Sequence, residues 1–215
     1  MRRDVSPTLS QRLPLVLLLT AGALGVLAVA LLLGTPRPPE PLPVYGQLPA
    51  FTLRDQDDRP FGDGHLRGHV FIADFIFTRC PTVCPVLTER MRQLQREAKA
   101  SGVDVRFVSF SVDPRHDTPP RLKEYARVHG VDLGNWSLLT GPLDVVEQTV
   151  IDGFRVLMGR DADAGDEDFL SILHGEHFVL LDAQARVRGY YTVAKDTEGP
   201  HTLLRDAARL THEAP

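Results

Sequence analysis

Apolar residues fall into one long block near the start of the chain and several shorter runs after it. The long block, Leu15–Leu33, contains no charged residue and approaches the roughly 20 apolar residues that a membrane-spanning helix needs. Arg2, Arg3 and Arg12 precede it, and the positive-inside rule keeps such a stub in the cytoplasm while the rest is exported. The pattern predicts that residues 1–34 form a cytoplasmic stub and a single N-terminal transmembrane helix.

A cleaved signal peptide is the alternative interpretation of this block, because Ala28–Ala30 resembles a cleavage signal. Signal-peptide cores usually contain about 7–15 apolar residues, and Leu31–Leu33 continue the block past that length, which favours an uncleaved anchor. No cysteine lies near the block to accept a lipid. Residues 35–49 contain six prolines, which predicts an extended, semi-rigid linker before a folded domain over residues 50–215.

Within the predicted domain, the shorter apolar runs switch between strand-like and helix-like spacing. The predicted strands are His69–Phe77, Val105–Val112 and Trp136–Thr140, followed by a hairpin of Phe178–Leu181 and Val187–Val193. The predicted helices are Val86–Ala98, Pro119 to just before Gly130, Leu143–Ile151 and His201–Thr211. This order of elements predicts an α/β fold, a sandwich built on a mixed central sheet.

The charge balance excludes one broad class of function. The chain has 24 Lys and Arg against 28 Asp and Glu, a net charge of −4. A nucleic-acid-binding protein needs a basic surface that displaces counterions, so this balance argues against a nucleic-acid partner. Five of the acidic residues lie in Gly159–Asp168, which has no hydrophobic residue larger than Ala and is predicted to be a solvated loop.

The two cysteines of the chain, Cys80 and Cys84, lie between the first predicted strand and the first predicted helix of the domain. At this spacing, a strand-to-helix junction can bring both sulfurs to one side of the first helical turn. The partial positive charge of a helix N-terminus lowers the pKa of a thiol, so the pattern predicts two reactive thiolates side by side. The alternative is that both cysteines are small, buried core residues.

Two adjacent thiolates narrow the choice of metal. Soft sulfur ligands favour Cu(I), zinc or iron–sulfur centres, but zinc and iron–sulfur sites usually need four protein ligands and the chain has no further cysteine. Cu(I) is satisfied by two or three ligands, and an imidazole is the natural third. Of the eight histidines, His174 and His177 stand out because they bracket the entry to the strand at Phe178. Position alone leaves both as candidates.

Three acidic residues have no role assigned by these patterns. Asp74 lies inside an apolar strand, where a buried carboxylate needs a partner or a raised pKa. Asp113 and Asp117 lie in a proline-containing turn, and we expect Asp117 or Thr118 to cap the following helix. The alternative is that the two aspartates support a metal site or contact a partner.

These residues together resemble the SCO/SenC family of membrane-anchored, thioredoxin-fold copper proteins, roughly from Leu48 to Ala208. The segments that carry the resemblance are Pro49–Leu53 with Asp55–Gln56, Ala73–Pro85, Ser111–Pro119, Asn135–Gly141, and His174 with Phe178–Asp182. A CxxxC motif alone is weak, but CPTVCP after an apolar strand, with DPRHDTP and a late histidine, is specific. Two positions depart from the family: Gly175 replaces a small hydroxyl residue, and Asp182-Ala183-Gln184 replaces Pro-Asp-Gly.

The resemblance implies a thioredoxin-like domain that binds one copper ion, as Cu(I) or Cu(II), through Cys80, Cys84 and His174. It favours His174 over His177 because Phe178 begins four residues after His174, as the family spacing requires. It also implies a metallochaperone, not a turnover enzyme, that serves the dinuclear copper centre of cytochrome c oxidase subunit II or another copper protein.

With the N-terminal pattern, this predicts a single-pass protein of a bacterial inner membrane whose C-terminal domain lies in the periplasm. The alternative function is an extracytoplasmic thiol–disulfide oxidoreductase in which Cys80 and Cys84 are the redox pair that reduces a partner's cysteines. Thioredoxins place two residues between such cysteines and this chain places three. A simple reductase also has no need of the distal histidine.

Overall fold

The computed structural model describes residues 9–33, 40–160, 172–193, 196 and 198–213. The chain forms two compact units, Met1–Pro41 and Leu42–Pro215. The described part of the first unit contains one helix, α1 (Leu9–Leu33), with Pro14 inside it. Among the described residues, none of the helices meets the length and apolarity that a membrane crossing requires.

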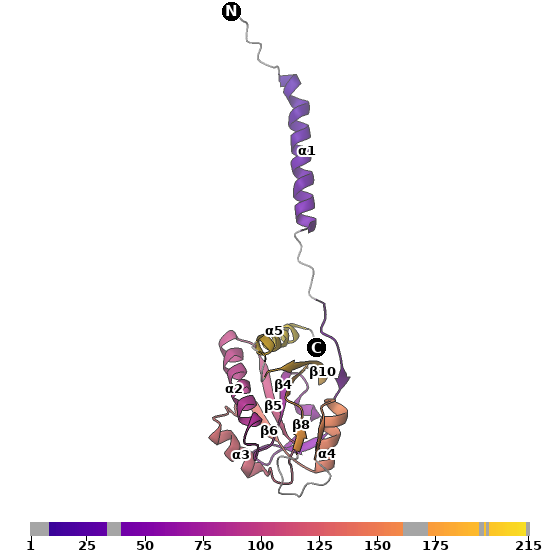
Figure 1. The fold of residues 1–215 in the computed structure, drawn as a ribbon. Helices are drawn as coiled ribbons and strands as arrows, with labels where there is room; N and C mark the ends of the chain where they lie inside the picture. Colours follow the sequence, from indigo (N-terminus) through magenta and orange to yellow (C-terminus); the bar gives the residue numbers. More distant parts are fainter. Residues whose placement is uncertain (1–8, 34–39, 161–171, 194–195, 197, 214–215) are drawn as a thin grey trace, which may run out of the picture. The chain divides into compact units, whose positions relative to one another are not determined.

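The second unit is built on a six-stranded mixed sheet (Figure 1). Its strands, in spatial order, are β1 (Gly46–Gln47), β10 (Arg186–Thr192), β9 (His177–Leu181), β4 (Val70–Ile76), β5 (Val105–Ser111) and β6 (Trp136–Leu139). Strands β4, β5 and β6 are parallel, whereas β9 and β10 form an antiparallel hairpin and β9 pairs antiparallel to β4. The predicted mixed α/β architecture and the predicted hairpin are therefore confirmed.

Helices cover both faces of this sheet, as Figure 1 shows. On one face, α2 (Val83–Ser101), α3 (Pro119–Val128) and α5 (Glu198–His212) share a hydrophobic cluster with alternate residues of β4, including Ile72 and Ile76. On the other face, α4 (Leu143–Glu147) and the π-helical turn η2 (Gln148–Gly153) pack with Phe71 and Phe75. All seven residues of β4 are buried, which explains its nearly continuous apolar sequence.

Two short hairpins complete the second unit. One pairs β2 (Thr52–Arg54) with β3 (Pro60–Gly62), which leads into the 3₁₀ turn η1 (Asp63–His65). The other pairs β7 (Met158–Arg160) with β8 (Ile172–His174) in antiparallel register, with Met158 directly opposite His174. Most of the predicted acidic loop Gly159–Asp168 falls in residues 161–171, which lie outside the described residues.

Three differences from the predicted boundaries bear on the extent of the domain or on the cysteines. Strand β1 lies inside the predicted linker, because Gly46 and Gln47 pair with Val187 and Arg186 of β10, so the folded unit begins before residue 50. Helix α5 begins at Glu198, which places Pro200 in its first turn, where a missing N–H is tolerated. Helix α2 begins at Val83 and not at Val86, so that Cys84 belongs to the helix.

Candidate metal centre

The two cysteines meet at the N-terminus of α2. Cys80 lies in the turn after β4, where its N–H donates to the carbonyl of Phe77 at 3.2 Å. Cys84 lies in the first turn of α2, and its N–H donates to the Sγ of Cys80 at 3.4 Å. Both are free thiols, and both are buried, with 7% of Cys80 and 0% of Cys84 exposed. The sequence prediction that the motif brings the sulfurs together is confirmed.

The prediction of a lowered thiol pKa is wrong for Cys84. Its thiol hydrogen-bonds to Cys80, and this bond together with burial raises the pKa of Cys84 far above its usual range. The negative charges of Cys80 and Asp74 act in the same direction. Burial and this bond outweigh the helix N-terminus because the site tolerates only one negative charge without a cation. The metal-free pair is therefore asymmetric, with Cys84 as a protonated donor to the sulfur of Cys80.

Two buried polar residues, Asp74 and Tyr125, lie close enough to the cysteines to interact with them electrostatically. Asp74 is fully buried in β4, as its place in the apolar strand suggested. The hydroxyl of Tyr125, from α3, lies 2.7 Å from the hydroxyl of Thr88, from α2. Burial raises the pKa of Tyr125, the hydrogen bond with Thr88 acts in the opposite direction, and the nearby Asp74 and Cys80 raise the pKa further. These groups are thus close enough to influence one another, so a cation at the sulfurs would relieve a shared electrostatic cost.

Asp117 holds the turn that leads to Cys80, and the prediction that it or Thr118 caps α3 is wrong. Its carboxylate accepts hydrogen bonds from the Thr78 N–H at 3.1 Å, the Thr78 hydroxyl at 2.5 Å and the Ser111 hydroxyl at 2.7 Å. Thr118 occupies the N-cap position of α3 without a side-chain capping bond. Burial raises the pKa of Asp117, although these hydrogen bonds act in the opposite direction.

Asp113 contacts the residue directly before Cys80. The guanidinium of Arg79 donates to Asp113 Oδ2 at 2.8 Å, and the ring of His116 lies 3.1 Å from Asp113 Oδ1. Sequence reasoning expected Asp117 or Thr118 to cap α3 and left open a metal-supporting role for Asp113 and Asp117, but it did not single out Arg79 or His116 as their partners. A signal was available, because Arg79 and Asp113 follow neighbouring parallel strands, whose carboxyl ends meet at one edge of the sheet.

The histidine ligand remains a prediction. The backbone of His174 lies at the end of β8, but its side chain is outside the described structure. His177, the other candidate, is exposed and begins β9, where it pairs with Thr192. Within the part of the chain that the structure describes, no group of three or more His, Cys, Asp or Glu side chains is placed to hold a metal ion. Of the three predicted ligands, the structure brings together Cys80 and Cys84.

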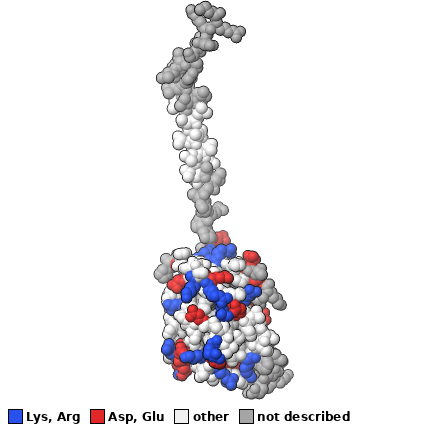
Figure 2. All heavy atoms as spheres, turned by 90° about the vertical axis from the view of Figure 1, so that its left-hand side faces the viewer, with Lys and Arg blue, Asp and Glu red and all other residues white. Residues whose placement is uncertain are grey.

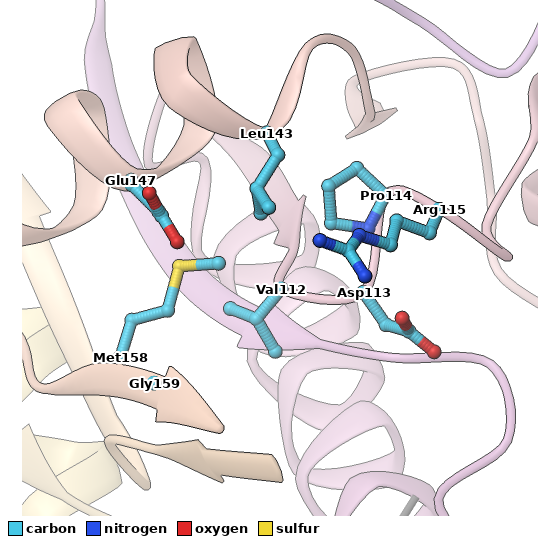
Figure 3. A pocket seen from close by; sticks show the side chains of 8 residues that line it. All are labelled: Val112, Asp113, Pro114, Arg115, Leu143, Glu147, Met158 and Gly159. Carbon is cyan, nitrogen blue, oxygen red and sulfur yellow. The ribbon is translucent and has the colours of Figure 1, made fainter. Parts of the chain in front are cut away.

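A cavity of about 240 Å³ lies beside Asp113 (Figure 3). Its lining residues are Val112, Asp113, Pro114, Arg115, Leu143, Glu147, Met158 and Gly159. The sulfur of Met158 points into it, toward Leu143 and Glu147 (Figure 3). Because Met158 pairs with His174, the cavity adjoins the hairpin that carries the predicted third ligand.

The donor set fits a soft monovalent metal. Two sulfurs four residues apart, facing each other in a buried turn, provide the thiolate pair that Cu(I) prefers. The raised pKa of Cys84 means that a metal must displace its proton, which a strongly bound soft cation can do.

The chain is similar in sequence and in fold to known proteins. A family model described as SCO1/SenC matches residues 45–211. A SCO1/SenC family lipoprotein from Bacillus anthracis shares 37% identity, with a TM-score of 0.70 over 78% of this chain and 96% of that structure. BsSco, described as a member of the Sco family of cytochrome c oxidase assembly proteins with a disulfide switch, shares 31% identity, with a TM-score of 0.66 over 80% of this chain and 99% of that structure.

A third similar structure contains the metal. Bradyrhizobium japonicum ScoI with copper bound shares 25% identity with this chain, with a TM-score of 0.59 over 76% of this chain and 99% of that structure. Copper thus matches both the donor chemistry of the cysteine pair and a structure of the same fold.

Proposed function

The chain belongs to the SCO1/SenC family, and on that premise we propose that it is a copper metallochaperone for the dinuclear copper centre of cytochrome c oxidase. The observation that carries the proposal is the contact between the N–H of Cys84 and the sulfur of Cys80. It places two soft donors together at a helix N-terminus, where negative charge is stabilised. BsSco, with the same fold, is described as a cytochrome c oxidase assembly protein.

In this function the chain binds copper as cargo. Cys80 and Cys84 supply two thiolates, and the proton of Cys84 leaves when copper binds. Because burial and the bond to Cys80 favour the protonated Cys84, its proton competes with copper and affinity falls at low pH. A partner with a stronger set of ligands can then take the metal while the proton returns to Cys84.

His174 is our candidate for the third ligand. Its support is its spacing from the strand at Phe178, together with its place at the end of β8. Gly175 permits a close approach of the chain there, because a Cβ at this position would lie 2.6 Å from Cγ1 of Val156. An imidazole added to two thiolates also suits Cu(II), which the sulfurs alone bind less well.

We place the protein in a bacterial inner membrane, with residues 1–34 as the anchor and the copper-binding domain in the periplasm. The uncharged block Leu15–Leu33 and the arginines before it support this proposal. The Bacillus anthracis relative is described as a lipoprotein, whereas this chain has no cysteine near its N-terminal block. In this location, the partner of the chain would be the exported copper domain of oxidase subunit II or another copper protein.

A second function shares the same cysteines. The asymmetry of the pair, with Cys84 buried and protonated and Cys80 nearer the surface, is also what a thiol–disulfide oxidoreductase needs to reduce a partner's cysteines. Such a reductase would use Cys80 and Cys84 and would not need His174.

Complementation separates the two functions. In a strain that lacks this gene, we expect reduced copper content in cytochrome c oxidase, restored by the full-length chain and not by Cys80→Ser or Cys84→Ser. Loss of rescue in His174→Ala, with His177→Ala as the matched control, supports the metallochaperone. Full rescue by His174→Ala supports the reductase, and normal oxidase in the deletion strain rejects both.

A further inference from the structure

The turn that presents Cys80 is held at three successive points. The N–H of Cys80 donates to Phe77, the backbone and hydroxyl of Thr78 donate to Asp117, and the side chain of Arg79 reaches Asp113. By contrast, Cys84 is placed by the helix to which it belongs. The position of the Cys80 sulfur relative to Cys84 therefore depends on how firmly this turn is held.

The contact between Arg79 and Asp113 is partly buried and well directed. Nη2 and Nε of Arg79 lie 2.8 and 3.3 Å from the same carboxylate oxygen of Asp113. The Asp113 side chain is 2% exposed and that of Arg79 is 19% exposed. Such a pair is little screened by water, and removing one partner leaves the other charge poorly compensated.

His116 closes the cluster. Its Nδ1 lies 3.0 Å from Nη2 of Arg79 and 3.1 Å from Oδ1 of Asp113. The ring therefore bridges the two charged groups and limits the freedom of the Arg79 side chain. Since Arg79 directly precedes Cys80, a constraint on Arg79 passes to Cys80 through a single peptide unit.

We propose that Arg79 and Asp113, bridged by His116, are positioning residues that fix the sulfur of Cys80 for copper. The inference rests on the proposed function in that Cys80 is taken as a copper ligand. Neither Arg79 nor Asp113 binds the metal; their ion pair holds the turn so that both sulfurs can bind one ion. Asp117 holds the neighbouring Thr78 in the same way, but among the described residues no cation forms an ion pair with it, so the two aspartates have separable roles.

The expected loss of copper affinity can be judged from other residues that orient metal ligands without binding the metal themselves. Loss of such groups typically weakens metal affinity about 10–100-fold. We expect Arg79→Gln and Asp113→Asn each to weaken Cu(I) binding within this range. Since both changes break one interaction, the double variant should lose little more than either single variant.

The test uses the full-length chain and competition for Cu(I) against a chromophoric Cu(I) chelator. Arg127→Gln is the matched control, because Arg127 and Glu124 form an exposed ion pair on α3 and Arg127 contacts neither Arg79 nor Asp113 in any hydrogen bond of the described residues. Arg79→Lys keeps the charge but not the planar fork, so partial recovery relative to Arg79→Gln is expected. The Cu(II) forms of Arg79→Gln and Asp113→Asn should show altered thiolate absorption and copper hyperfine splitting, which a general loss of stability would not produce.

Hydrogen exchange of the metal-free chain makes the outcome independent of copper. Asp113→Asn should accelerate exchange of the Cys80 amide, and Arg127→Gln should not. Unchanged exchange and unchanged affinity in Arg79→Gln and Asp113→Asn overturn the proposal, as do losses that simply add in the double variant. If Asp113→Asn does not fold, Arg79→Gln decides, because it leaves Asp113 beside His116. Absence of copper binding in the unaltered chain instead overturns the proposed function.

Discussion

The backbone N–H of Cys84 donates a hydrogen bond to the sulfur of Cys80 at 3.4 Å. The same sulfur also accepts a hydrogen bond from the thiol of Cys84. This bond and burial raise the pKa of Cys84. Cys80 therefore accepts hydrogen bonds while Cys84 stays protonated, although the two cysteines belong to one motif.

This asymmetry predicts the order in which the thiols react. In the reduced, metal-free chain, we expect iodoacetamide to modify Cys80 before Cys84, because Cys84 is fully buried and predominantly protonated. The rate of modification of Cys84 should be at least roughly tenfold lower than that of Cys80, since the thiolate is the reacting form. Peptide mapping by mass spectrometry at short reaction times measures both rates, with urea-unfolded chain as the control. Modification of Cys84 first would show that the pair is arranged the other way round.

The contacts of Asp117 predict a stability effect. Asp117→Ala removes the acceptor for the partly buried Thr78 and the buried Ser111, whose donors lose their partner. Unsatisfied buried donors cost about 1–3 kcal/mol each, so we expect a loss of about 3 kcal/mol in the free energy of unfolding. Asp117→Asn keeps one oxygen acceptor and should lose less. Urea unfolding measures both, and an unchanged Asp117→Ala midpoint would contradict the hydrogen-bonding role.

Asp182 predicts a dependence of stability on pH. Burial alone would raise its pKa, but hydrogen bonds from the Arg186 N–H and from the side chains of Arg188 and Arg186 hold its pKa below the usual range. A lowered pKa in the folded state means that the ionised group stabilises the fold above its unfolded pKa of about 3.9. This contribution is lost as pH falls through the folded pKa.

We therefore expect the unaltered chain to lose stability more steeply than Asp182→Asn does as the pH falls below about 4. At neutral pH, Asp182→Asn should cost roughly 3 kcal/mol, because it leaves Arg188 with less compensation in its buried site. Unfolding free energies measured across this pH range test both points. Asp58→Asn is the control, since Asp58 belongs to an exposed pair with Arg54. Parallel pH curves for the unaltered chain and Asp182→Asn would show that Asp182 has no such role.

The two candidate histidines give a direct comparison. His174→Ala should weaken copper binding, and Cu(II) more than Cu(I), because imidazole suits Cu(II) and two thiolates can retain Cu(I). His177→Ala should leave the absorption and paramagnetic spectra of the Cu(II) form nearly unchanged, since His177 is exposed at the start of β9. The reverse pattern would identify His177 as the ligand.

The fold was predictable where one physical signal dominated. The apolar run at β4 and the helical spacing of Leu122, Tyr125 and Ala126 in α3 predicted their elements because burial of those faces sets the pattern. The start of α2 was predicted less well, because the helical run was expected from Val86, although the spacing of the cysteines already suited a first helical turn and Pro85 is tolerated there.

The proximity of the two cysteines was predictable from the sequence, whereas the residues that hold their turn were not. Cys80 and Cys84 are close in sequence, so local geometry was enough to bring them together. Asp117 lies 39 residues from Thr78, and only the pairing of β4 with β5 shows that they meet. The pKa of Cys84 followed burial and the bond to Cys80, which a helix-terminus rule does not contain.

Charged side chains of both signs are mixed on the surface of the second unit (Figure 2). The face of the second unit shown in Figure 2 carries basic and acidic side chains close together, without a continuous basic stripe. Helix α2 also carries ion pairs between opposite charges, such as those of Glu89 with Arg92 and Arg96.

Copper stoichiometry of the purified full-length chain tests the central claim most directly. Metal analysis after Cu(I) loading should give one copper per reduced chain, and none after oxidation to a Cys80–Cys84 disulfide, whose sulfurs are poor ligands. The variant with both Cys80→Ser and Cys84→Ser should also bind none, because it lacks the soft donor pair. One copper per chain in that double variant would contradict the account and place the metal elsewhere.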